Sequence, residues 1–255
     1  MNHMSIELLS IDLSNYCTKN CPFCYNHSSP EGNILWKPQE VISFALDCVS
    51  HGVKAVSLGG GEPFEYDGIF EIIDVMVPKA YLSVTSNGLP LGTRISWEFL
   101  AKHHPDKIHL SLHNPENEHE LNSIIGKLKE IERIGIKPGC NLLVSASNTE
   151  KGRMAYLELS KTLLPEQIII IPKRYIDTPT PEQLAYVSDG KPFQSPSCIL
   201  GCCKPAGFAS VSWDKKVNFC SYASGKVPLD SLDFNGMINA LKKVEFKTCT
   251  PDEDI

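Results

Sequence analysis

The sequence lacks the features that would place it in a membrane, outside the cell or on nucleic acid. Its 255 residues contain no apolar run long enough to cross a bilayer. The opening MNHMSIELLS lacks the basic segment, apolar stretch and small-residue cleavage site of a secretory signal. A net charge of -6 argues against general binding to nucleic acid. We therefore expect a cytoplasmic protein with no membrane or nucleic-acid partner.

Cysteine, by contrast, is abundant, with 10 residues in the chain. In a reducing compartment this favours metal ligands over disulfides. Cys17, Cys21 and Cys24 form a Cys-x3-Cys-x2-Cys pattern within NYCTKNCPFCYN. Three thiolates at this spacing suit a four-iron cluster and leave one iron open for substrate or cofactor. A zinc site that uses His27 as its fourth ligand is the alternative for this segment.

A second motif follows an apolar strand in KAVSLGGGEP, residues 54–63. Together with the cysteine loop, this motif resembles the radical S-adenosylmethionine (radical SAM) superfamily. In that family the loop follows the first barrel strand, and S-adenosylmethionine chelates the open iron through its amino and carboxylate groups. Gly60, Gly61, Glu62 and Pro63 match the family motif at the end of the second strand. We expect the glycines to let the backbone approach the methionine amino group and Glu62 to supply an acceptor.

Alternating strand and helix patterns predict an α/β fold, a partial (β/α)6 TIM-like barrel over residues 1–180. Strands are expected at 5–14, 54–60, 81–87, 107–113, 137–147 and 167–175. Helices are expected at 37–51, 67–77, 94–104, 117–134 and 151–163. Segments such as LSVTSN and KIHLSLH put polar side chains on one strand face, which predicts a polar lumen suited to a ligand. An antiparallel sheet with one solvated face is the alternative.

The family resemblance also implies contacts to S-adenosylmethionine. Tyr25 matches the aromatic residue beside the adenine, and Ser111 or His113, with Asn148, match positions that meet the ribose or the methionine end. His113 and His109 are candidate acids or bases, although a histidine on a polar strand face is more often a hydrogen-bonding wall residue.

Two cations and two further cysteines complete the barrel prediction. Lys173 and Arg174 follow the apolar run of the sixth strand, where they would hold a carboxylate or phosphate; an ordinary solvated loop pair is the alternative. Cys48 and Cys140 continue apolar stripes and are expected to be buried small hydrophobic residues.

The last part of the chain, residues 181–255, is predicted to be a separate cysteine-rich extension. It resembles the twitch or SPASM extension of radical SAM enzymes, which carries an auxiliary four-iron cluster on a hairpin and a helix. The candidate ligands are Cys198, Cys202, Cys203, Cys220 and Cys249. Four of these would bind the cluster, with Cys202 and Cys203 as rivals for one position and a zinc ion as the alternative metal.

The expected hairpin of this extension is FASVSWDKKVNFC, with its turn at Asp214. The family places a glycine directly after the turn aspartate, where this chain has Lys215.

Taken together, the resemblance implies reductive cleavage of S-adenosylmethionine to a 5'-deoxyadenosyl radical that takes a hydrogen atom from a substrate. Cys220 and His113 are the candidate catalytic residues, and a flavodoxin or ferredoxin is the implied electron donor. Modification of a ribosomally made peptide is the leading prediction, although a first strand near residue 5 leaves no room for an N-terminal leader-binding domain. A small molecule such as a nucleotide or cofactor precursor is the alternative substrate, and a non-catalytic iron-sulfur or zinc module is the third possibility.

Overall fold

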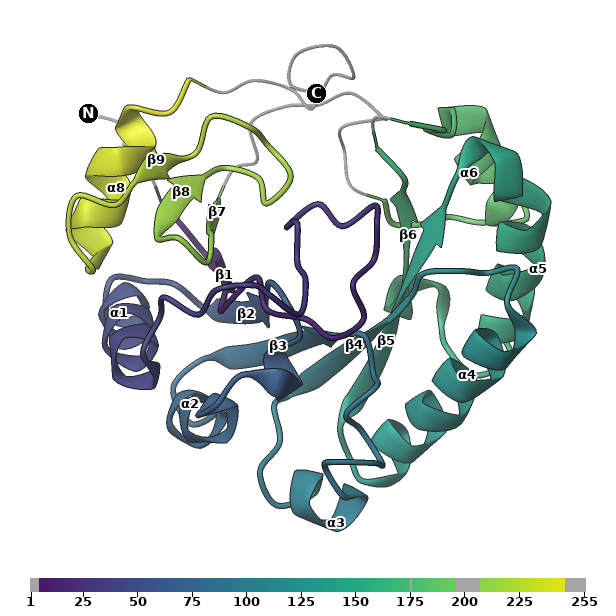
Figure 1. The fold of residues 1–255 in the computed structure, drawn as a ribbon, viewed down its shortest axis with the longest axis horizontal. Coiled ribbons are helices and arrows are strands. Elements are labelled where there is room, and N and C mark those ends of the chain that lie inside the picture. The colour runs from purple at the N-terminus through teal and green to yellow at the C-terminus, as the bar shows by residue number, and fades with distance from the viewer. Residues whose placement is uncertain (1–4, 175, 196–206, 246–255) are drawn as a thin grey trace.

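A computed structural model describes residues 5–174, 176–195 and 207–245. One curved sheet surrounds a central space, and the helices cover its outer face (Figure 1). The strands are β1 Leu8–Asp12, β2 Ala55–Gly59, β3 Tyr81–Ser86, β4 Lys107–Leu112, β5 Lys137–Val144, β6 Ile168–Pro172, β7 Phe208–Val211, β8 Lys216–Asn218 and β9 Val227–Pro228. The helices are α1 Pro38–Ser50, α2 Ile69–Met76, α3 Trp97–Leu100, α4 Glu118–Arg133, α5 Thr149–Leu159, α6 Pro181–Val187 and α8 Phe234–Lys242.

The first six strands are parallel neighbours in chain order, which confirms the predicted barrel-like α/β fold. The antiparallel alternative is therefore wrong. The full order is β6-β5-β4-β3-β2-β1-β7-β8-β9. Because β7 pairs in parallel with β1, the predicted extension contributes a strand to the barrel sheet rather than forming a separate layer.

The core lies between the sheet and the outer helices, as the strand alternation predicts. Leu82, Val84, Leu110 and Leu142 are fully buried on the helix-facing side. Each such side chain contributes about 1.5–3 kcal/mol when it leaves water. Cys48 and Cys140 are also fully buried, so the prediction of two packing cysteines is confirmed. No helix in the described ranges is long and apolar enough to cross a membrane.

Several predicted elements are shorter than expected, and local hydrogen bonds explain two of them. Helix α3 begins at Trp97, since the Ser96 side chain accepts a hydrogen bond from the Phe99 N–H at 3.2 Å and acts as the N-cap. Strand β5 ends at Val144, because the Asn148 carboxamide accepts from the Ser145 N–H at 2.8 Å and starts a 3-10 turn. The predicted strand over residues 145–147 is therefore wrong.

The predicted hairpin forms between β7 and β8, which pair antiparallel. Lys215 in its turn has φ of 60°, a left-handed conformation that favours glycine, the residue that the resemblance to the twitch or SPASM extension predicts here. The Lys215 ammonium lies 3.0 Å from a Glu40 carboxylate oxygen and 5.1 Å from the centre of the Trp36 ring. These contacts fasten the hairpin to the start of α1.

Candidate active site

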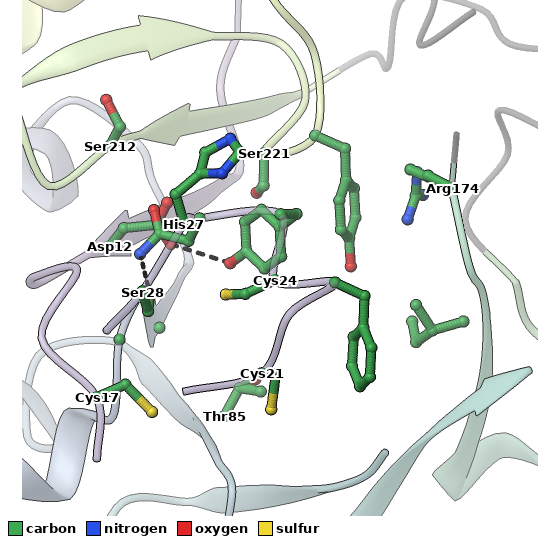
Figure 2. A pocket seen from close by; sticks show the side chains of 18 of the residues that line it. Asp12, Cys17, Cys21, Cys24, His27, Ser28, Thr85, Arg174, Ser212 and Ser221 are labelled. Atoms are coloured by element: carbon green, nitrogen blue, oxygen red, sulfur yellow. Dashed lines mark hydrogen bonds between the residues drawn. The ribbon is translucent and has the colours of Figure 1, made fainter. Parts of the chain in front are cut away.

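A cavity of about 1040 Å³ opens at the carboxyl ends of the strands, the end where parallel barrels place their active sites. Its volume is at the upper end of the range for ligand pockets. Its inner wall is polar and comes from five successive strands: Ser10, Ser57, Thr85, Ser111 and Asn141. The predicted polar lumen is therefore present, and it faces the loop that carries the three cysteines (Figure 2).

That loop joins β1 to α1 and lies across the mouth of the barrel (Figure 1). Short backbone hydrogen bonds shape it: the Cys17 N–H donates to the Ser29 carbonyl at 3.0 Å, and the Cys24 N–H donates to the Cys21 carbonyl at 3.1 Å. All three cysteines line the cavity, and Figure 2 shows their sulfur atoms around one part of it. The loop therefore presents a three-thiol donor set to the ligand space.

This donor set fits a four-iron cluster better than a single zinc ion. Within the described ranges, no three His, Cys, Asp or Glu side chains are grouped so that they could hold one metal ion. A zinc site built from the three thiols and His27 would require such a group. In an iron-sulfur cube each thiolate binds a different iron, so convergence of the sulfurs on one point is not needed. The Asn87 amide also donates to the Cys17 sulfur at 3.5 Å, the kind of contact that tunes a cluster.

Burial raises the pKa of the Cys17 thiol and raises that of Cys21 to about 11. Both thiols are therefore protonated at neutral pH until a metal displaces the proton. Lys19, on the same loop, acts in the opposite direction at Cys21 because its positive charge favours the thiolate.

The glycines of the GGGEP motif hold the cysteine loop. A Cβ added to Gly61 would lie 1.9 Å from the Tyr16 carbonyl oxygen, and one added to Gly60 would lie 2.6 Å from the Ser14 carbonyl oxygen. The Gly61 N–H donates to the Ser14 carbonyl at 2.7 Å, and the Glu62 N–H donates to the Tyr16 carbonyl at 2.9 Å. Only glycine lets the two backbones approach this closely.

The Glu62 side chain faces the protein interior, where protein groups donate hydrogen bonds to its carboxylate. One carboxylate oxygen accepts from the Ser86 hydroxyl at 2.8 Å and from the Phe64 N–H at 3.1 Å, and the other accepts from the Asn87 N–H at 2.7 Å. Glu62 is fully buried, and burial raises its pKa to about 7. Glu62 and Pro63 are not among the cavity-lining residues, so the motif reaches the cavity only through Gly60 and Gly61.

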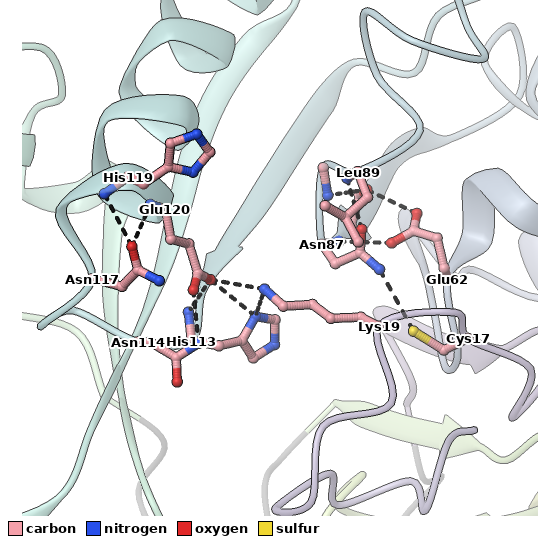
Figure 3. A network of polar contacts seen from close by, with 12 residues as sticks. Cys17, Lys19, Glu62, Asn87, Leu89, His113, Asn114, Asn117, His119 and Glu120 are labelled. Atoms are coloured by element: carbon pink, nitrogen blue, oxygen red, sulfur yellow. Dashed lines mark hydrogen bonds and ion pairs between the residues drawn. The ribbon is translucent and has the colours of Figure 1, made fainter. Parts of the chain in front are cut away.

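A second polar network joins the cysteine loop to β4 and α4 (Figure 3). The Lys19 ammonium lies 2.8 Å from a Glu120 carboxylate oxygen and 2.9 Å from Nδ1 of His113. Burial alone would raise the pKa of Glu120, but hydrogen bonds from His113, Lys19 and Asn114 hold it well below its usual range. The network anchors the loop at the side opposite the GGGEP contact.

His113 lines the cavity as predicted, and burial lowers its pKa. With Lys19 donating to its Nδ1, the neutral ring carries its proton on Nε2. His109 lies deeper and does not line the cavity; its Nδ1 faces the Asn141 side-chain oxygen at 3.1 Å, and burial lowers its pKa to about 4. It is a hydrogen-bonded residue behind the cavity wall, where it contacts Asn141.

Of the other residues predicted to contact S-adenosylmethionine, two line the cavity and one does not. Tyr25 and Ser111 line the cavity. Asn148 does not, because its side chain caps the turn after β5 and its amide nitrogen lies 3.4 Å from a Glu116 oxygen. The prediction that Asn148 meets the ligand is therefore not supported.

Lys173 and Arg174 both line the cavity, at the end of β6. The Arg174 guanidinium carbon lies 3.5 Å from the centre of the Tyr222 ring, and Tyr222 packs against Tyr25 with ring centres 4.7 Å apart. Cation–π contact of this kind fixes the guanidinium orientation. The sequence did not single out Tyr222, which contacts both Tyr25 of the cysteine loop and Arg174 after β6.

Asp12 is a second residue that the sequence analysis missed. It ends β1, lines the cavity and is 1% exposed. Burial raises its pKa to about 6. The signal was available, because Ser10 and Asp12 continue along β1 the polar alternation seen in the other strands.

Of the five cysteines predicted to bind an auxiliary cluster, the structure describes only Cys220. Cys198, Cys202, Cys203 and Cys249 lie outside the described residues. Cys220 follows β8, is partly exposed and is not among the cavity-lining residues, so its predicted catalytic role is not supported.

Known proteins that resemble this chain include a protein family, curated relatives and solved structures. Residues 11–137 match the Radical SAM superfamily. A probable GTP 3',8-cyclase of Sulfurisphaera tokodaii is 29% identical over 146 residues, which cover 52% of this chain and 45% of that protein. The match thus spans less than half of the relative's length.

Two solved structures share the fold at low identity. Streptococcus suis SuiB bound to precursor peptide SuiA superimposes with a TM-score of 0.66 at 16% identity, over 85% of this chain and 60% of that one. The enzyme anSMEcpe with bound AdoMet and Cp18Cys peptide gives 0.62 at 13% identity, over 93% and 81%. The cysteine loop and the GGGEP contact lie within residues 11–137, the range that matches the Radical SAM superfamily.

Proposed function

We propose that the chain is a radical SAM enzyme that acts on a small anionic substrate of the nucleotide or cofactor-precursor class. A cluster held by Cys17, Cys21 and Cys24 would supply the electron that splits S-adenosylmethionine into methionine and a 5'-deoxyadenosyl radical. The protein positions that chemistry and excludes competing reactions. The substrate gives up one hydrogen atom, and the product 5'-deoxyadenosine carries it away.

The residues of the cavity have distinct parts in this proposal. Gly60 and Gly61 hold the cysteine loop against β2 and leave backbone surface open to the methionine end. Tyr25, packed on Tyr222, offers an aromatic face to the adenine. Ser111, on the polar inner wall, supplies a hydroxyl for the ribose.

The positively charged side chains of the cavity are the observation that favours an anionic substrate. Lys173, Arg174 and Lys226 line it in a chain whose net charge is -6. Cations concentrated in a cleft attract and hold anionic ligands, and Arg binds phosphate or carboxylate bidentately. The GTP 3',8-cyclases named among the relatives agree with a nucleotide.

A peptide, the leading prediction from sequence, is the second candidate. The observation that favours it is the open sheet: the strand order ends at β6 and at β9, and these two edges do not pair with each other in the described part of the chain. A peptide could enter between them. The peptide-bound neighbours are below 20% identical and support only the shared fold.

The test is substrate-dependent formation of 5'-deoxyadenosine by anaerobically reconstituted enzyme. We expect GTP to stimulate it above the level without substrate. Arg174→Ala should weaken GTP binding by about 30-fold, since a charge pair that loses one partner costs about 2 kcal/mol or more. Lys161→Ala is the matched control, because Lys161 is an exposed cation that pairs with Glu158 and does not line the cavity. Wild-type enzyme that does not bind GTP, or an Arg174→Ala variant that binds it normally, would overturn the nucleotide proposal.

We also propose that residues 181–255 carry one auxiliary four-iron cluster, with Cys220 as a ligand beside Cys198, Cys203 and Cys249, and Cys202 as the rival of Cys203. The density of cysteines in this segment supports the proposal. Reconstituted protein should then hold about eight irons rather than about four. If Cys220→Ala leaves the iron and sulfide content unchanged, Cys220 is not a ligand.

A further inference from the structure

Asp12 is a buried carboxylate whose hydrogen-bonding capacity is largely unused. One oxygen accepts from the Tyr25 hydroxyl at 3.4 Å, a long contact. The other oxygen has no hydrogen-bond partner within the described residues, although Asp12 is only 1% exposed. Buried polar groups are almost always satisfied, because leaving one unpaired costs free energy. An unpaired carboxylate oxygen in a cavity wall therefore indicates a group that is completed by a ligand.

Packing, rather than hydrogen bonding, fixes the position of this carboxylate. A Cβ on Gly60 would lie 3.0 Å from both Cα and Cβ of Asp12, so the end of β2 packs closely beside it. Asp12 is also paired with Gly59 in the register of β1 and β2. The two strands thus hold Asp12 in place before a ligand arrives, which is the arrangement a selective site requires.

The charges around the cavity indicate what kind of ligand completes it. Asp12 lies on β1, whereas Lys173 and Arg174 follow β6 at one edge of the sheet. Figure 2 shows Asp12 and Arg174 on different sides of the pocket. Lys226 and Asp214 are charges on the hairpin side that act on Asp12 with opposite sign. The other carboxylate of the cavity, Asp214, already pairs with Lys216 at 2.6 Å. Asp12 is thus the carboxylate that is available to a donor on the substrate.

We propose that Asp12 anchors the substrate by accepting hydrogen bonds from two adjacent N–H donors, as presented by the N1–H and 2-amino edge of guanine. This inference rests on the proposed function, because it assigns the base end of a nucleotide to Asp12 and its phosphates to the cationic side. A carboxylate offers two acceptor oxygens at the spacing of such a donor pair, and hydrogen bonds to a charged acceptor are about twice as strong as neutral ones. Asp12 then determines specificity and takes no part in the radical chemistry.

The experiment measures equilibrium binding of GTP, ITP and XTP to the anaerobic holoenzyme by calorimetry. ITP lacks the 2-amino donor, and XTP has a carbonyl acceptor in its place. Wild-type enzyme should prefer GTP over ITP by about 10- to 100-fold, the discrimination typical of a bidentate contact. Asp12→Asn should lose GTP affinity by a similar factor and gain affinity for XTP, because a carboxamide offers one acceptor and one donor. A merely structural role for Asp12 would not produce this exchange of preference.

Asp214→Asn is the control, since it removes the paired carboxylate of the same cavity and should leave the order of the three nucleotides unchanged. Cluster absorbance verifies that each variant is loaded. Equal wild-type binding of all three nucleotides, or an Asp12→Asn variant with the wild-type order, overturns the anchor while the nucleotide proposal stands. Wild-type enzyme that binds none of the three overturns the nucleotide proposal and the anchor together.

Discussion

Replacing Gly61 with Ala should detach the cysteine loop from β2 and thereby remove the cluster site. The new Cβ would lie 1.9 Å from the Tyr16 carbonyl oxygen, where ordinary contact is about 3.4 Å or more, so the backbones must separate. Separation breaks the hydrogen bonds from the Gly61 and Glu62 N–H groups, at about 1 kcal/mol each. Overpacking adds about 1–3 kcal/mol. We expect a total loss of about 3–5 kcal/mol of unfolding free energy, a large part of the 5–15 kcal/mol typical of a domain.

The assay has two parts, urea unfolding of the metal-free protein and iron content after anaerobic reconstitution. Gly59→Ala is the matched control, because its Cβ would lie 3.5 Å from Asp12, an ordinary contact. We expect the control to change stability by less than about 1 kcal/mol and to retain iron. Gly61→Ala should lose most of its bound iron. A Gly61→Ala variant with wild-type stability and iron content would refute the role assigned to the glycines.

Two further predictions concern charge in the cavity. Burial raises the pKa of Asp12 from 3.8 to about 6. The contribution of the protonated Asp12 carboxyl to folding stability is therefore fully present below pH 3.8 and is lost as pH rises through 6. At about 1.4 kcal/mol per pKa unit, the loss approaches 3 kcal/mol. Asp12→Asn should therefore be more stable than wild type at pH 8 but not at pH 4 in urea unfolding, and parallel pH profiles of the two proteins would contradict the burial argument. Lys19→Met should raise the pKa of His113, because the Lys19 charge helps to lower it while Glu120 remains beside it. An NMR titration of His113 that is unchanged in the variant would show that Lys19 does not control the ring.

The sequence predicted the barrel and the cluster loop because both depend on local patterns. Alternation along LSVTSN and KIHLSLH identifies the strand faces, and the burial of Leu82 and Leu110 follows from it directly. The cysteine spacing and the glycine motif are each contained in one short segment. The three cysteines, Gly60 and Gly61 could therefore be assigned to one site before any contact was known, and all five residues line the cavity.

The errors arise where function depends on contacts between distant segments. Glu62 belongs to the expected motif, yet Ser86 and Asn87 of the next strand use its oxygens. Tyr222 packs against Tyr25 only because β7 pairs with β1, a pairing that no local pattern indicates. Asn148 was placed by analogy with the family, whereas here the short turn after β5 takes its side chain.

The central claim is that Cys17, Cys21 and Cys24 hold a cluster with one open iron that binds S-adenosylmethionine. The most direct measurement is electron paramagnetic resonance of the reduced, reconstituted protein with and without S-adenosylmethionine, together with assay of 5'-deoxyadenosine. We expect the wild-type spectrum to shift when S-adenosylmethionine is added and 5'-deoxyadenosine to form, and we expect both responses to disappear in Cys17→Ala, Cys21→Ala and Cys24→Ala. A wild-type spectrum that S-adenosylmethionine leaves unchanged, or 5'-deoxyadenosine formation that survives loss of one of these thiols, would contradict the claim.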